Sequence, residues 1–450
     1  MREQRTVQSS IFERYAQHEI GGELQAMSAW LDEHRELLDW VAGDLRTRPV
    51  QATGRKGLSA ETVLRCAILK QYRQLSYDEL EFCLLDSMSC QSFARLTTGW
   101  LPKKAALHRV ISAVSDTTWE RINQCLLHNA KQAKVEKGEM LRIDSTVTDA
   151  PIHAPSDSTL LWDSVRVMVR LLEWAAELAD GVTVVHYCNH QRLAKKRMRA
   201  IQYTRGADKR ARLYRELLEV TEKSVGYIEE AAMTLHVAQA SLPPDYAAWR
   251  SQWVHFEPLI RRVIEQTERR VLGGESVPSR DKVVSIFEEH TDIIVKGSRA
   301  VQYGHKLNVS TGRSALILDV VIEQGNPADA ERLVPMLDRH IAHYGKAPRQ
   351  MAADGGYASL GNLTEAKARG VSDVVFHKKC GLKMEAMAKS PWVYRKLRNF
   401  RAGIEAGISC LKRAYGLGRC SWKGWVHFKA YVWSSVVAHN LALFVRLKPT

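Results

Sequence analysis

The chain has 450 residues, of which 45% are hydrophobic and 26% are charged. This length predicts two to four domains, and the ordinary composition excludes a largely disordered chain. The net charge of +15, with an isoelectric point near 9.4, favours a polyanionic partner, either nucleic acid or an anionic membrane.

The cysteines and the apolar stretches narrow the class of protein further. The eight cysteines contain no C-x2-C pair, which argues against a zinc finger, and their spacing favours reduced thiols. The N-terminus, MREQRTVQSSIFERY, lacks an apolar signal core. The most apolar stretch, residues 430–445, contains His439 and Asn440 and is shorter than the ~20 residues of a membrane span. We therefore predict a buried helix there, no membrane partner, and a cytoplasmic protein that binds nucleic acid.

Residues 1–135 have a helical pattern with several start signals. Ser59 precedes an apolar helical run, and Ser76 with Glu79 has the spacing of a capping box. Short helices joined by polar turns predict a helix-turn-helix-like DNA-binding domain. A helical dimerisation domain remains the alternative.

A strand pattern and then a long helical block follow. Residues 136–157 alternate, are rich in Ile, Val and Thr, and carry Asp144. Residues 158–282 return to helix, with a break at Leu-Pro-Pro 242–244. Between Arg192 and Arg215 there are ten Lys or Arg and one acid, which predicts a phosphate-contacting surface or a solvated helix face. The DNA-binding candidates in this run are Lys195, Lys196, Arg197 and Arg199.

Residues 283–450 alternate between strands and helices. Strand patterns at 282–297 and 305–325 precede a helix, a strand ending at Asp354, a helix, a strand, and a helix carrying Glu405. Without the 158–282 block, this order is that of an RNase H-like α/β core, a mixed sheet with flanking helices. We therefore predict four segments: an N-terminal domain (1–135), the first strand of the core (136–157), a helical insertion (158–282), and the remaining core with C-terminal helices (283–450).

Two aspartates lie on or directly after predicted strands. Asp144 stands among apolar strand residues, where a carboxylate is costly unless a metal or another group pairs with it. Asp354 ends a short strand before Gly355 and Gly356, which we expect to let the chain turn sharply. A capping aspartate and a plain Asp-Gly turn are the respective alternatives.

Glu405 is the most informative acid. It is the only Asp or Glu from residue 386 to the C-terminus, a segment in which Lys and Arg are frequent. This imbalance indicates a phosphate-facing surface in which a single retained acid binds metal; an ion pair with Arg401 or Arg398 is the alternative. Arg398, Arg401, Glu405 and Lys412 share one helix face by their spacing.

These residues resemble the insertion-sequence transposases of the DDE type whose third acid lies in a Y-R-E-K signature. Arg401, Glu405 and Lys412 meet the R-x3-E-x6-K pattern, whereas Arg398 stands where the family has Tyr, and Tyr394 lies one turn earlier. The motifs I-D-S-T (143–146), A-D-G-G-Y (353–357) and L-S-Y-D-E-L-E-F-C-L-L-D-S (75–87) resemble further family regions.

The resemblance implies a function for the whole chain. Asp144, Asp354 and Glu405 would bind two Mg²⁺ or Mn²⁺ ions per active site. Water would attack the phosphodiester at the element's end, and the freed 3′-hydroxyl would then attack target DNA. The partners would be double-stranded DNA, as terminal inverted repeats and target, and a second copy of the chain in a homodimer. Arg398, Arg401, Lys412 and Arg413 would hold the DNA near the cleavage point.

Other readings remain open at this point. An RNase H-like nuclease that cuts without joining and a domesticated, non-catalytic DNA-binding protein are the functional alternatives. His186, Cys188 and His190 have metal-ligand chemistry, but we expect a structural role for them on a helix. His305 and Lys306 are candidates for approaching the scissile phosphate, and we expect Trp422 and Trp425 to pack in the core.

Overall fold

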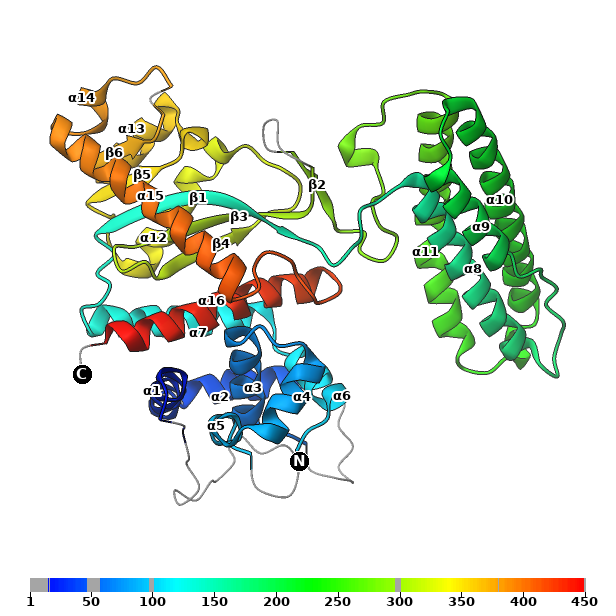
Figure 1. The fold of residues 1–450 in the computed structure, drawn as a ribbon, viewed down its shortest axis with the longest axis horizontal. Helices are drawn as coiled ribbons and strands as arrows, with labels where there is room; N and C mark the ends of the chain where they lie inside the picture. The colour runs from blue at the N-terminus through cyan, green and yellow to red at the C-terminus, as the bar shows by residue number, and fades with distance from the viewer. Residues whose placement is uncertain are drawn as a thin grey trace. The chain divides into compact units, whose positions relative to one another are not determined.

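The computed structural model describes residues 15, 17–46, 57–96, 101–295, 301–378 and 380–448 (Figure 1). The chain divides into two compact units. The sheet-containing unit comprises residues 1–151 and 304–450, and the helical unit comprises residues 152–303.

The sheet-containing unit is built of helices around one mixed sheet. Its helices are α1 (Glu19–Glu33), α2 (Glu36–Arg46), α3 (Ala60–Tyr72), α4 (Tyr77–Asp86), α5 (Met88–Phe93), α6 (Lys104–Ile111), α7 (Asp116–Gln132), α12 (Leu333–Tyr344), α13 (Leu360–Ala368), α14 (Met384–Met387), α15 (Pro391–Ala414) and α16 (Trp425–Leu447). Its strands are β1 (Met140–Asp149), β3 (Gln302–Thr311), β4 (Ile317–Ile322), β5 (Gln350–Ala353) and β6 (Asp373–Phe376). The prediction of an α/β fold is therefore confirmed.

The sheet has the strand order β4-β3-β1-β5-β6 within this unit. β1 pairs antiparallel with β3, and β3 pairs antiparallel with β4. On its other side β1 pairs parallel with β5, which pairs parallel with β6. Three antiparallel strands followed by parallel strands with intervening helices fit the predicted RNase H-like core.

A single apolar core joins the N-terminal helices to the C-terminal end of the chain. Its members run from Leu24 to Phe444, and α16 packs against α7, α3 and α1. Residues 430–442 of α16 are all buried, which confirms the buried helix predicted from the sequence. The predicted segment boundary at residue 135 is not visible as a division of this core.

The predicted helix start signals are present. The Ser59 side chain accepts a hydrogen bond from the backbone N–H of Thr62, and Ser76 with Glu79 forms the capping box of α4. Each cap satisfies backbone donors that the first helical turn leaves without partners. None of the helices that the structure describes is long and apolar enough to cross a membrane.

The helical unit is a bundle with its own apolar core. It contains α8 (Asp157–Ala179), α9 (Gln191–Tyr203), α10 (Ala207–Val237), α11 (Tyr246–Thr267), the short helical turns η2 (Gln239–Ser241), η3 (Glu268–Leu272) and η4 (Ser279–Asp281), and the three-residue strand β2 (Asp292–Ile294). The predicted break at Leu-Pro-Pro 242–244 separates α10 from α11, as expected for residues that cannot continue a helix.

Two local predictions in this unit were wrong. The strand predicted over 282–297 is reduced to β2, and Lys296 and Gly297 lie outside the described residues. The apolar residues Val283 and Ile286 pack into the helical core instead. The backbone N–H and carbonyl of Val283 form hydrogen bonds with the Gln266 side chain of α11. The residues from His186 to His190 form no helix, because α9 begins only at Gln191.

Candidate active site

Asp144 and Asp354 are brought together by strand register. Ile143 of β1 lies opposite Ala353 of β5 in the parallel pair, so the residues that follow lie side by side. Asp144 is still within β1, whereas Asp354 is the first residue after β5. The two carboxylates therefore share one end of the central strands, the edge at which open α/β sheets collect ligands.

Glu405 reaches the same place from α15, which packs across β1, β5 and β6. Ser390 caps this helix by accepting from the backbone N–H of Val393, and Pro391 occupies its first turn. Arg142 of β1 fastens the middle of the helix by donating to the Phe400 carbonyl at 2.8 Å. Gly403 makes this contact possible, because a Cβ there would lie 2.1 Å from the Arg142 Nη1.

One guanidinium joins the three acids. Arg401 Nη2 lies 3.1 Å from Asp144 Oδ2 and 3.2 Å from Asp354 Oδ1, and Nη1 lies 2.6 Å from Glu405 Oε1. The Arg401 side chain is 9% exposed, whereas the Glu405 side chain is 62% exposed. The structure thus gathers three carboxylates around a single buried positive charge, and the Glu405–Arg401 ion pair considered from the sequence is part of that arrangement.

A second layer of polar groups supports Asp144. The backbone N–H of Ser145 donates to Asp144 Oδ1 at 2.7 Å, and the Ser145 hydroxyl donates to Asp329 Oδ2 at 3.3 Å. Asp329 also pairs with Lys306, whose ammonium lies 2.5 Å from Asp329 Oδ1 and donates to the Pro327 carbonyl. A fourth carboxylate and its counter-charge therefore lie directly beside the predicted acids.

Tyr357 lies buried beneath these carboxylates. Its hydroxyl donates to Asn308 Oδ1 at 2.5 Å. Burial raises the pKa of the Tyr357 hydroxyl, and the negative charges of Asp329, Asp144 and Asp354 raise it further. The phenol is therefore held neutral and serves as a fixed hydrogen-bond donor below the site.

The chain turns at Gly355 and Gly356 directly after β5, as predicted, but it does so without a left-handed backbone. Neither has a positive φ, and both lie in the short helical turn η6 (Gly355–Tyr357). Their role is close approach: a Cβ at Gly355 would lie 2.9 Å from the Lys378 Cβ, and one at Gly356 would lie 2.7 Å from Asp329 Oδ2. The absent side chains leave room for Lys378 beside Gly355 and for Asp329 beside Gly356, directly after Asp354.

The other predicted cations of α15 lie apart from the acids. Arg398 is exposed, with its guanidinium 5.9 Å from the centre of the Tyr394 ring, and Arg413 donates to Ser409. Lys412 is partly buried and, with Lys70 and Arg419, lines a cavity of about 380 Å³. Burial lowers the pKa of Lys412, and the negative charge of Asp149 opposes that shift. Of the predicted face, Arg401 contacts Asp144 and Asp354, and Glu405 is joined to them through Arg401.

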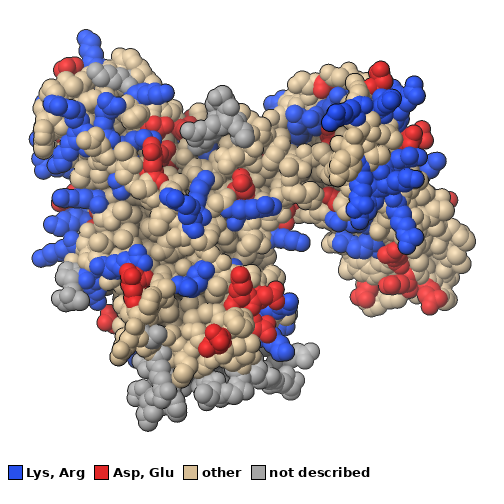
Figure 2. Space-filling model, viewed as in Figure 1, with Lys and Arg blue, Asp and Glu red and all other residues tan. Residues whose placement is uncertain are grey.

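The predicted basic run of the helical unit begins on α9 and continues into α10. Ala194, Met198 and Ile201 are buried, whereas Lys195, Lys196 and Arg199 are exposed. Figure 2 shows Lys and Arg side chains gathered over this helix. Arg197 is partly buried and pairs with Glu216 at 2.8 Å, so it is less available to a ligand than its neighbours.

The remaining sequence candidates have structural contacts. His305 is buried against Trp425 and Phe428. Trp422 is buried in the core, as predicted. His190 contacts Ser224 and Tyr227. Among the described residues, His186, Cys188 and His190 do not form a metal-ligand cluster.

Sequence reasoning missed Asp329, Ser145 and Tyr357. Asp329 has the pattern of an acid at a helix start, and it precedes α12 in the short turn η5 (Asp329–Glu331). Ser145 directly follows Asp144 in the motif I-D-S-T, and Tyr357 lies three residues after Asp354 in the motif A-D-G-G-Y. Their closeness to the predicted acids was a signal in the sequence, whereas nothing in the sequence near Asp329 pointed to the site.

Comparison with known families matches residues 296–441 to the family described as Transposase DDE domain. This span contains Asp354 and Glu405, and Asp144 precedes it. Comparison with curated proteins and with solved structures gave no match. The matched residues supply most of the sheet, and the central strand β1 completes it. Residues 296–441 therefore match a transposase DDE domain, and this match supports a DDE-type transposase.

Proposed function

We propose that the chain cuts DNA at the ends of an insertion sequence and joins those ends to target DNA, with Asp144, Asp354 and Glu405 as its catalytic residues. The observation that carries this proposal is the convergence of the three carboxylates on Arg401, within 3.2 Å of its guanidinium nitrogens. They come from β1, from the end of β5 and from α15, so the fold has brought together acids far apart in sequence.

The donor set fits hard divalent ions. Mg²⁺ and Mn²⁺ prefer oxygen ligands, and a few carboxylates with water and phosphate complete their coordination. The position of Arg401 supports this fit, because the three acids already require a positive charge between them. When bound, two such ions would activate the attacking oxygen and stabilise the leaving oxygen of a phosphodiester.

The chain's own residues would prepare the site in three ways. Asp144 is held by the Ser145 backbone, so its free oxygen keeps a fixed direction. Arg401 would turn away from the acids when ions bind, and its guanidinium would then be free to grip a DNA phosphate. Lys306 and Asp329 would hold Ser145 and the floor of the site in place.

The DNA would be held by cations outside the acids. Arg398, Arg413 and Lys412 lie on α15, and Lys195, Lys196, Arg197 and Arg199 lie on α9. The net charge of +15 supports binding of the chain to a polyanion. We also propose that two copies of the chain act together on paired DNA ends, and that residues 1–135 contribute to binding those ends.

The test is a cleavage and joining assay with Mg²⁺ on DNA from either side of the reading frame. We expect joined products from the chain and loss of both cutting and joining in Asp144→Asn, Asp354→Asn and Glu405→Gln. Cuts without joining would support a nuclease, and binding alone would support a non-catalytic protein.

The matched control is Asp338→Asn. Asp338 lies on α12, and its carboxylate pairs with Arg369 rather than with Arg401. This variant should cut and join as the unaltered chain does. If Asp144→Asn retained joining, the assignment of the catalytic residues would be wrong.

A further inference from the structure

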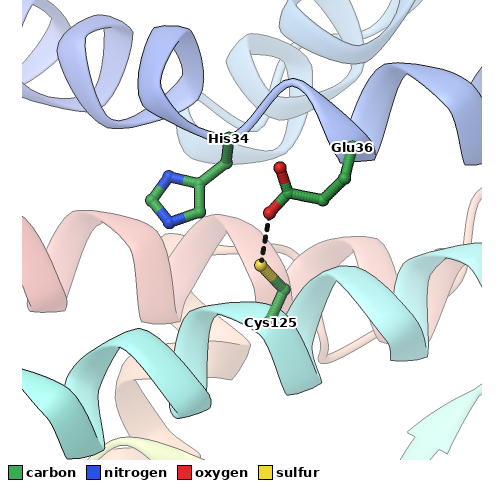
Figure 3. Close-up of side chains that lie close together, drawn as sticks. All are labelled: His34, Glu36 and Cys125. Atoms are coloured by element: carbon green, nitrogen blue, oxygen red, sulfur yellow. Dashed lines mark hydrogen bonds between the residues drawn. The ribbon is translucent and has the colours of Figure 1, made fainter.

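Three side chains with metal-ligand chemistry meet in the N-terminal helices, at residues that the proposed transposition reaction does not use (Figure 3). His34 follows the end of α1, Glu36 begins α2, and Cys125 lies in α7. One nitrogen, one carboxylate oxygen and one sulfur from these residues all lie within 4.8 Å of one another. The Cys125 thiol donates to Glu36 Oε1 at 3.3 Å.

The histidine is prepared for metal binding by its hydrogen bond. His34 Nδ1 lies 2.8 Å from the backbone carbonyl of Trp30. A carbonyl oxygen only accepts, so Nδ1 carries the proton and Nε2 of the neutral ring keeps its lone pair. A backbone carbonyl that fixes the histidine tautomer in this way is a common outer partner of metal-binding histidines.

Trp30 also fixes the position of the imidazole. Its ring stacks on the His34 ring with 4.2 Å between centroids and 22° between planes. Its indole N–H donates to Asn129 Oδ1 at 3.2 Å, and Asn129 lies one turn after Cys125 in α7. The histidine is thereby held relative to the same helix that carries the cysteine.

We propose that His34, Glu36 and Cys125 form a binding site for one Zn²⁺ ion, with water as its fourth ligand. Nitrogen, thiolate and carboxylate are the ligands that Zn²⁺ takes in proteins, whereas Mg²⁺ prefers oxygen alone. The three side chains are half-buried or exposed, so an ion can reach them. The donor atoms lie within 4.8 Å of one another, so the three side chains would have to draw together to reach zinc distances of about 2.0–2.3 Å.

The bound ion would fasten the corner between α1 and α2 to α7. At present Glu36 and Cys125 share a single thiol hydrogen bond, which is a weak link. Zn²⁺ would replace it with bonds from α2, from α7 and from the turn between α1 and α2. This site is separate from Asp144, Asp354 and Glu405, so the proposal stands or fails independently of the proposed function.

The test uses Co²⁺ as a spectroscopic substitute for Zn²⁺ on the full chain. Bound thiolate produces a sulfur-to-cobalt charge-transfer band that a carboxylate site cannot produce. We expect this band on Co²⁺ addition, its disappearance when Zn²⁺ displaces Co²⁺, and its loss in Cys125→Ser. His34→Gln should weaken Co²⁺ binding by at least about 10-fold.

Three controls keep the result specific. Cys83→Ser should retain the band, because Cys83 lies outside the proposed site and pairs with Cys90, with the two sulfurs 2.9 Å apart. Cys188→Ser, at an exposed thiol of the helical unit, should retain it as well. Asp144→Asn should also retain it, which separates this site from the proposed catalytic ions.

A thermal unfolding measurement provides a second readout. Zn²⁺ should raise the Tm of the unaltered chain and of Cys188→Ser, but not that of Cys125→Ser. The absence of a charge-transfer band in the unaltered chain, or its persistence in Cys125→Ser, would overturn the proposal.

Discussion

At the scale of single residues, Arg401 supplies the positive charge that the three acids of the candidate site share. Three carboxylates at close range repel one another, and Arg401 offsets this repulsion from a position that is 9% exposed. The same guanidinium would compete with a divalent ion for the same oxygens. The proposed metal binding and the position of Arg401 would therefore be coupled.

This coupling predicts the effect of Arg401→Ala. Removing one partner of a buried ion pair costs about 3–5 kcal/mol, and the exposure of Glu405 reduces the expected loss toward about 2 kcal/mol. Chemical unfolding in EDTA should show this loss, and Mg²⁺ should stabilise the variant more than the unaltered chain.

The control for this prediction is Arg398→Ala, which removes an exposed cation one turn earlier in α15. Its stability should change by no more than about 0.5 kcal/mol. An Arg401→Ala variant with unchanged stability in EDTA and no greater response to Mg²⁺ would contradict the coupling.

At the scale of elements, the placement of α15 depends on its contact with β1. Arg142 donates to Thr311 at 2.6 Å and to the Phe400 carbonyl, so it links β3, β1 and α15. Gly403 is the point at which the helix must lack a side chain. The position of Glu405, two residues later, follows from this contact.

Gly403→Ala should therefore destabilise the chain although alanine is the better helix former. The added Cβ would displace Arg142, and overpacking of this kind costs about 1–3 kcal/mol. Gly407→Ala is the matched control in the same helix, because a Cβ there meets nothing within 4 Å. It should be neutral or stabilise by up to about 1 kcal/mol. Urea unfolding of both variants measures the difference, and equal effects would refute this account.

The basic face of α9 gives a second prediction at this scale. If Lys195 and Lys196 each contact a phosphate, the variant carrying Lys195→Gln and Lys196→Gln should bind DNA more weakly. The slope of log affinity against log salt should fall by about 1.8, since each phosphate contact contributes about 0.9. Lys223→Gln, at an exposed lysine of α10 outside the basic run, should leave the slope unchanged. An unchanged slope in the double variant would place the DNA elsewhere.

At the scale of the whole molecule, two buried histidines make stability depend on pH. Burial lowers the pKa of His340 in α12 and of His439 in α16 to about 4. The unfolded chain binds these protons near pH 6.5, so the folded state loses stability as pH falls from about 6.5 toward 4. Each histidine contributes a slope of up to about 1.4 kcal/mol per pH unit in that window.

Equilibrium unfolding between pH 7.5 and 5 should therefore show falling stability on acidification. The variant carrying His340→Gln and His439→Gln should lose most of this slope, whereas His128→Gln, at an exposed histidine, should keep it. A flat profile in the unaltered chain would contradict the prediction.

The sequence was a good guide to local structure. The caps at Ser59 and Ser76, the strand carrying Asp144 and the helix carrying Glu405 depend on neighbouring residues, and they lie as predicted. The prediction of a strand over 282–297 was wrong for most of its length, because apolar residues of this segment pack on helices. The spacing of apolar residues along the sequence does not show which surface will cover them.

The sequence by itself determined the α/β class, the elements that carry the three acids, and their order along the chain. The family match at residues 296–441 agrees with that reading. These properties follow from hydrophobic periodicity, capping residues and local motifs, all of which act over a few residues.

Only the tertiary structure decided which groups meet. The register of β1 with β5 places Asp144 beside Asp354, and the packing of α15 turns Arg401 toward both. Asp329 and the cluster of His34, Glu36 and Cys125 also depend on contacts between distant segments. Such contacts arise from strand pairing and helix packing, which no local pattern encodes.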